Sequence, residues 1–229
     1  MKPVAPGVYC FTGLVVGRVH LIEDPDGLTI IDTGLELAAA RILRQVAAHG
    51  RKATDIRRIL ITHAHPDHVG GLPALQLATG AQVFASAIER PVIEGKIPVP
   101  RVPPEKLSGL IRLRPPETIF KPCPVHQELQ GGETLPVLGG LQAVFTPGHA
   151  PGHLAFWQPE QRLLFCGDVL FNLPKLRLPF AMLTVDMQEN IRSIRKLVEL
   201  QPETVIFGHG EPLHKAAPAL RRFADSLPG

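Results

Sequence analysis

The sequence predicts an α/β fold within one domain, and three observations predict it. The chain has 229 residues, a length that suits one large domain. In its first third, short apolar runs alternate with segments of helical spacing, an order that favours parallel strand pairing. Proline accounts for 24 residues, about twice the usual share of ~5%. So much proline favours many short elements joined by stiff turns.

The first half of the chain contains the clearest alternation of strand and helix. Residues 4–19 are interpreted as strand, turn and strand, punctuated by glycines. Residues 28–31 are β-branched and bounded by Asp-Gly and Asp-Thr-Gly, which predicts a buried strand. The next elements are expected to be a helix at 35–49, a strand at 56–61, a helix at 72–79 and a strand at 82–85.

Residues 91–124 interrupt the alternation with prolines and scattered basic residues. We predict a proline-rich insertion at the surface, with a wall or lid over a site as the alternative. The strand signal then returns, with strands expected at 141–145, 154–157, 163–166 and 204–207. An amphipathic helix is expected at 188–200.

Charge and cysteine usage narrow the class of protein. The net charge is +3, and the basic residues are spread along the chain, whereas a nucleic-acid binder more often has a dense basic stripe. Cys10, Cys123 and Cys166 are too few and too far apart for a disulfide framework, so we expect reduced thiols in the cytoplasm. The chain has no apolar run of ~20 residues, so no membrane segment is expected.

The strongest chemical signal follows the predicted strand at 56–61. His63, His65, Asp67 and His68 place four metal-binding side chains within six positions. Buried together, they are costly unless something binds them. Imidazole and carboxylate donors suit zinc, iron or manganese.

Three further donors stand at the ends of other predicted strands, each beside a glycine: His149, Asp168 and His209. Because ligands collect beyond the carboxyl ends of strands in α/β folds, these sites support one another.

Together these segments resemble a known family. THAHPDHVGG from Thr62, TPGHAPGH from Thr146, CGD from Cys166 and FGHG from Phe207 are similar to the successive motifs of the metallo-β-lactamase superfamily, in its glyoxalase II-like and lactonase-like branches. The early Asp32-Thr33-Gly34 fits as well. The resemblance implies a four-layer αβ/βα sandwich with a two-metal site along one edge.

The resemblance also implies a role for each donor. The first metal would be held by His63, His65 and His149, the second by Asp67, His68 and His209, and both by Asp168. Asp32 would orient a ligand histidine through its other ring nitrogen. The implied nucleophile is a hydroxide that bridges the metals, with Asp67 orienting it and carrying a proton. Two zinc ions are expected, and the donors would also accept iron or manganese.

Several positions narrow the choice within the family. Authentic β-lactamases of this family lack the bridging aspartate, so Asp168 argues against antibiotic hydrolysis beyond a weak promiscuous rate. Phe171 stands where quorum-signal lactonases carry a tyrosine. Residues 167–171 look more like glyoxalase II, yet only 20 residues follow His209, so we expect no glutathione-binding domain.

The sequence therefore predicts a dinuclear metal-dependent hydrolase of a small ester, thioester or lactone. A phosphodiesterase or nuclease of the same superfamily and a non-hydrolytic metal or redox module are the alternatives. The expected partner is a small-molecule substrate, not a nucleic acid or a membrane, and the sequence leaves the oligomeric state open. Lys175 and Arg177 are interpreted as solvated charges or as contacts to a substrate carboxylate. For His153 a structural role is predicted, with a supporting or substrate role as the alternative. The other remaining histidines are predicted to be ordinary surface residues or structural ones: His20, His49, His126 and His214.

Overall fold

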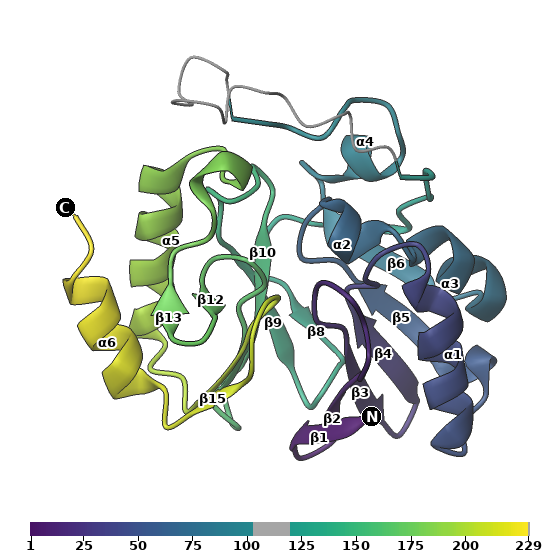
Figure 1. Cartoon of the computed structure of the whole chain (residues 1–229). Helices are drawn as coiled ribbons and strands as arrows, with labels where there is room; N and C mark the ends of the chain where they lie inside the picture. The colour runs from purple at the N-terminus through teal and green to yellow at the C-terminus, as the bar shows by residue number, and fades with distance from the viewer. Residues whose placement is uncertain (103–119, 229) are drawn as a thin grey trace.

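The computed structural model describes residues 1–102 and 120–228, and these form four layers, with helices outside two facing sheets (Figure 1). The predicted α/β class and αβ/βα sandwich are therefore confirmed. The middle of the predicted 91–124 insertion, residues 103–119, lies outside the described residues. The described residues before that gap include a short helix, α4 (Arg90–Ile93), followed by irregular backbone, and residues 120–126 after it are irregular as well.

Among the described residues, the first sheet has seven strands in sequential order. Its first four strands pair antiparallel, and β4 to β7 pair parallel. The strands are β1 (Lys2–Ala5), β2 (Val8–Cys10), β3 (His20–Asp24), β4 (Gly27–Ile31), β5 (Ile56–Leu60), β6 (Gln82–Ser86) and β7 (Gln127–Leu129). The helical elements of this half are α1 (Ala38–Ala48), η1 (Ala53–Asp55), α2 (Pro66–Val69) and α3 (Leu72–Thr79).

The second described sheet has six strands in the order β15-β14-β11-β10-β9-β8. Only the β11–β14 pair is parallel. The strands are β8 (Thr134–Leu135), β9 (Leu141–Phe145), β10 (Leu154–Gln158), β11 (Leu163–Phe165), β14 (Thr204–Ile206) and β15 (Leu213–His214). A separate hairpin joins β12 (Phe171–Asn172) to β13 (Leu176–Arg177), and the helical elements are η4 (Ala181–Leu183), α5 (Met187–Glu199) and α6 (Ala217–Asp225).

Three apolar clusters hold the layers together. One joins α1 and α3 to the outer face of the first sheet, for example Ile42 and Leu75 with Ile30. A second fills the space between the sheets, where Ile31 packs in the same cluster as Phe156. The third packs α5 and α6 on the outer face of the second sheet. Burying one such side chain contributes about 1.5–3 kcal/mol, so these faces fix the spacing of the sheets and of the loops at their edge.

The structure differs from the sequence prediction in a few places. The second half of the predicted 4–19 strand pair is a loop, because residues 11–19 leave the sheet after β2 and return at β3. The helix predicted from residue 35 begins at Ala38, after Gly34 takes a left-handed φ of 68°. The turn predicted across His63–His68 includes one helical turn, with Pro66 at its first position. Helix α6 was not predicted.

The described cysteines are free, as predicted, and all three are buried. Among the described residues, no helix is both long and apolar enough to cross a membrane.

Candidate metal centre

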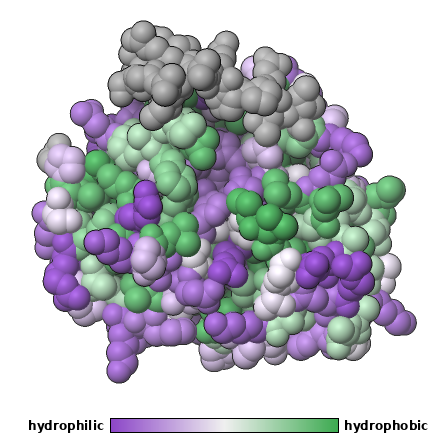
Figure 2. Space-filling view, viewed as in Figure 1, coloured by the Kyte–Doolittle hydropathy of each residue, from purple (hydrophilic) through white to green (hydrophobic). Residues whose placement is uncertain are grey.

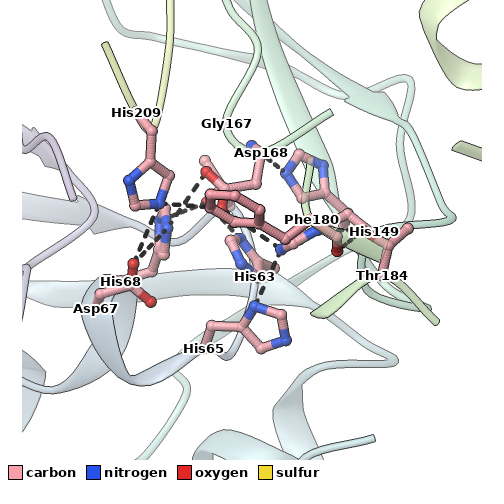
Figure 3. Close-up of polar contacts among 12 residues, drawn as sticks. His63, His65, Asp67, His68, His149, Gly167, Asp168, Phe180, Thr184 and His209 are labelled. Carbon is pink, nitrogen blue, oxygen red and sulfur yellow. Dashed lines mark hydrogen bonds and ion pairs between the residues drawn. The ribbon is translucent and has the colours of Figure 1, made fainter. Parts of the chain in front are cut away.

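The predicted donors lie on loops that follow strands of both sheets. The His63–His68 segment follows β5 in the first sheet, and His149, Asp168 and His209 follow β9, β11 and β14 in the second. Figure 3 shows these side chains converging from the two sheets. Their convergence follows from the sandwich, because both sheets present these strand ends at the same edge.

The seven predicted donors meet in three overlapping groups. In each group the candidate ligand atoms lie within 4.8 Å of one another. The groups are His63, His65 and His149; His63, His68 and Asp168; and Asp67, His68 and His209. The first and third groups are the two predicted ligand sets, and the second connects them.

Asp168 lies between those two sets. Its Oδ2 is 3.4 Å from His149 Nε2 and 3.2 Å from His209 Nε2, and its Oδ1 is 3.4 Å from His68 Nε2. Asp67 Oδ2 lies 3.2 Å from His209 Nε2, on the same side as His68. One carboxylate therefore faces imidazoles of both sets, as sharing two cations requires.

The residues fit a bound cation on a further ground. His63 Nε2, His68 Nε2 and Asp168 Oδ1 are buried and have no hydrogen-bond partner among the described residues. Such orphaned atoms are rare, because each costs roughly 1–3 kcal/mol. Divalent metals held by the two ligand sets would satisfy these atoms, and imidazole with carboxylate is a donor set that zinc, iron and manganese accept.

Burial and charge set the protonation of these groups in opposite directions. Burial lowers the pKa of His63 and His149 well below the ordinary value. Burial acts on His68 in the same direction, but the charges of the nearby aspartates overcome it and raise its pKa well above normal. For Asp168, burial is outweighed by the imidazoles, and its pKa falls well below normal. The ionised carboxylate is the form that binds metal, and the histidines bind as neutral imidazoles.

Asp32 contacts the ring of His68 and the loop that precedes it. Its Oδ2 is 2.8 Å from His68 Nδ1, and its Oδ1 accepts hydrogen bonds from the backbone N–H and hydroxyl of Thr62. The carboxylate therefore fixes the His68 ring with Nε2 toward the other donors.

The segment that follows Asp168 in the sequence also contributes side chains to the site. Thr184 Oγ1 lies 3.2 Å from His149 Nδ1 and donates to the Phe180 carbonyl. Phe180 stands beside the donors in Figure 3. The Arg177 guanidinium lies 4.9 Å from the centre of its ring. Of these residues, Thr184 carries no signal in the sequence, because its contact with His149 depends on how the η4 segment packs against the His149 loop.

Two of the remaining histidines, His20 and His153, are buried. His20 is buried at 4% exposure, against the ring of Phe165, so of the two predicted possibilities it is a structural histidine and not a surface one. His153 is buried against the Asp168 loop, where its Nε2 accepts the Asp168 N–H. His126 and His214 hydrogen-bond to nearby groups, and His49 faces Glu23.

The fold and the donor set define a class, the αβ/βα proteins with a metal centre at the sandwich edge. A family model described as the metallo-beta-lactamase superfamily matches residues 12–209. The chain therefore belongs to the metallo-β-lactamase superfamily.

The chain is similar to several bacterial proteins. It is 29% identical to the probable metallo-hydrolase YflN of Bacillus subtilis, over 91% of this chain and 86% of that protein. It is 35% identical to a hydroxyacylglutathione hydrolase of Ectopseudomonas mendocina, over 67% of this chain, but the match covers 47% of that protein. Among solved structures, a metallo-beta-lactamase family protein of Thermus thermophilus matches with a TM-score of 0.72, at 23% identity, over 96% of this chain and 79% of that one. The structural match supports the fold.

Proposed function

We propose that the protein is a hydrolase that holds two divalent metal ions and cleaves a small ester, thioester or lactone. The observation that carries this proposal is the position of Asp168, whose carboxylate lies within 3.4 Å of imidazoles from both ligand sets. His63, His65 and His149 would hold one ion, and Asp67, His68 and His209 the other. Five imidazoles and two carboxylates favour zinc, with iron and manganese as the alternatives.

When bound, two such ions supply Lewis acidity and a water of lowered pKa for nucleophilic attack. The chain supplies the proton transfers. Asp67 has 21% of its side chain exposed, so it lies at the accessible side of the donor set. Burial raises the pKa of Asp67, but the nearby His68 and His209 outweigh burial and the net shift is downward. An ionised Asp67 accepts the proton of the attacking water and returns it to the leaving group.

The surface around the site favours a substrate with apolar groups. Figure 2 shows two hydrophobic patches on either side of a hydrophilic hollow. Large exposed apolar side chains stand on the 11–19 loop and the 33–37 turn on one side, and on the 173–183 segment on the other: Val15, Val16, Leu35, Leu37, Leu173, Phe180, Met182 and Leu183. Apolar surface that a substrate buries there contributes about 25 cal/mol of binding free energy per Å². We therefore propose an ester or lactone of an apolar acid over a glutathione thioester.

The basic residues around the site give less support to the nuclease alternative. Arg18 is paired with Glu211, and Arg177 stacks on Phe180. A nucleic-acid site needs unpaired basic groups along a track. The partner we propose is a small molecule, and the free cysteines support a reducing compartment such as the cytoplasm.

The test is a panel of initial rates for metal-analysed protein. The substrates are an alkyl ester of an apolar acid, a lactone, a glutathione thioester, a β-lactam and a phosphodiester. Asp168→Ala removes the shared carboxylate, and Asp225→Ala, exposed on α6, is the matched control. We expect the ester or lactone to be cleaved fastest, with the rate lost in Asp168→Ala and kept in Asp225→Ala.

Two other results of this panel would overturn the proposal. A phosphodiester cleaved fastest would replace the proposal with the nuclease alternative. Two bound metals with no hydrolysis of any substrate would favour the redox module.

A further inference from the structure

Glu89 is a buried carboxylate that the reaction does not use. It follows β6, directly before α4, and only 2% of it is exposed. Its Oε2 accepts the backbone N–H of Ala64 at 3.0 Å, and its Oε1 accepts the N–H of Gly152 at 2.7 Å. No ion pair is found for it among residues 1–102 and 120–228. A buried carboxylate without a cation is costly to fold, so stability alone does not account for it.

The two N–H groups belong to the two loops that carry the first ligand set. Ala64 lies between His63 and His65, on the loop after β5 of the first sheet. Gly152 lies three residues after His149, on the loop after β9 of the second sheet. One side chain thus joins ligand loops from different sheets through charge-assisted hydrogen bonds, which are about twice as strong as neutral ones.

His153 extends this connection to the shared donor. Its Nε2 accepts the N–H of Asp168 at 3.1 Å, so the ring proton is on Nδ1 and is donated to Thr146 Oγ1, 2.8 Å away. A continuous chain of contacts therefore runs from Ala64 through Glu89, Gly152 and His153 to Asp168. None of these contacts occupies a ligand atom of a metal donor.

The second ligand set has a different support. His68 is held by Asp32 through its ring and by Thr33, whose N–H and hydroxyl both donate to the His68 carbonyl at 2.7 Å. Asp32 also accepts from Thr62, whose Oγ1 lies 3.1 Å from His63 Nδ1. Asp32 therefore reaches both sets, whereas the direct contacts of Glu89 are with the loops of the first set alone.

We propose that Glu89 is a positioning residue for the metal held by His63, His65 and His149. It sets the distance between the two loops that carry these histidines, and His153 sets the place of Asp168 against them. This inference rests on the proposed function to the extent that both ligand sets bind metal. It adds that the first metal depends on Glu89 more strongly than the second, which Glu89 reaches only through His153 and Asp168.

The experiment measures metal binding in Glu89→Gln. Glutamine has nearly the same shape but replaces one acceptor oxygen with an NH₂ group, which faces an N–H and cannot accept from it. Metal content is counted by elemental analysis, and the two affinities are measured by competition with a chromophoric chelator and by the absorption of the cobalt-substituted protein. We expect the affinity of one metal to fall ten- to a hundredfold, and the affinity of the other to fall clearly less.

Glu133→Gln is the matched control. Glu133 also accepts two backbone N–H groups, from Gln130 at 2.6 Å and from Gly131 at 2.9 Å, but it lies in the turn before β8. Its glutamine variant is expected to lose some thermal stability and to keep both metal affinities. If Glu89→Gln does not fold, Gly152→Ala is the second variant. A Cβ at Gly152 would lie 2.8 Å from Glu89 Cγ, Ile88 Cβ and Ser86 Oγ, so it displaces the loop with the carboxylate still present and is expected to weaken the same metal.

The outcomes separate the two proposals. A wild-type protein that binds no metal would overturn the proposed function. Wild-type binding of two metals, with both affinities unchanged in Glu89→Gln or both weakened equally, would overturn the positioning role and leave the hydrolase proposal standing. Equal loss in Glu133→Gln would also overturn it, because a general loss of stability would then explain the effect.

Discussion

Gly208 is the position where a single methyl group should remove the metal centre. It directly precedes His209, donates its N–H to Gly167 O, and accepts the Arg18 N–H, both at 2.8 Å. A Cβ at this position would overlap Asp168 Oδ1 and lie 3.0 Å from His68 Cε1. Its φ is outside the left-handed region, so alanine is compatible with the backbone. The closest conflicts are with the two donors, and the Gly167 carbonyl carbon follows at 3.2 Å.

The expected magnitude follows from the tolerance of metal coordination. Metal–ligand distances hold to about 0.2 Å, whereas the Asp168 oxygen must move much further to reach ordinary contact with the new Cβ. We therefore expect Gly208→Ala to lower metal affinity at least a hundredfold, which corresponds to about 2.7 kcal/mol at 1.36 kcal/mol per decade. Hydrolysis should fall with the loss of metal.

The assay is chelator competition for the metal together with thermal unfolding of the metal-free protein. Gly132→Ala serves as the control. A Cβ there meets nothing within 4 Å, but φ is 111°, so alanine is strained by about 1–3 kcal/mol and metal affinity should not change. Wild-type metal content and turnover in Gly208→Ala would refute the reasoning, because they would show that the donors do not occupy these positions in the working site.

Three further predictions follow from other contacts. Asp32→Ala frees the His68 ring and should lower metal affinity ten- to a hundredfold, measured by the same competition; unchanged affinity would contradict this role. Chelating the metals leaves buried donors unsatisfied. If the free metal is present at ~1,000 times its Kd, its removal should lower the free energy of unfolding by about 4 kcal/mol. Tm should then fall by roughly 10 °C, and re-added zinc should restore it. Burial, aided by the charge of Arg18, lowers the pKa of His20 to about 3, so below pH ~6.5 the unfolded chain takes up a proton that the folded protein does not, and stability falls as pH falls toward 3. At pH 4.5 this loss of stability is about 2–3 kcal/mol relative to pH 7. The free energy of urea unfolding of His20→Gln should lack that part of the decline. An equal decline in both proteins would count against a role of His20.

Four of the candidate donors could be predicted to lie together because their signal is local. In His63–His68, the side chains lie within six positions and follow a buried strand, so covalent geometry alone keeps them together. The helix predicted at 188–200 was confirmed within one residue at each end, because its apolar face repeats at helical spacing. Where the signal was weaker the prediction was wrong, as for residues 11–19, whose apolar residues lie on a loop.

The supporting residues were not predictable, because their roles depend on distant contacts. Glu89 stands in an ordinary turn sequence, and nothing near it in the chain marks a residue that binds two loops 25 and 63 positions away. His20 has no companion motif, and its burial depends on the packing of the two sheets.

The sequence by itself determined the main alternation of strands and helices, the family, and the residue types that meet at the sheet edge. The tertiary structure decided how His65 and His149, 84 positions apart, come within 3.0 Å of each other, and which side chains hold their loops. The physical reason is one of range. Periodicity and turn chemistry act over a few residues, whereas the distance between the two sheets is set by the apolar side chains buried between them.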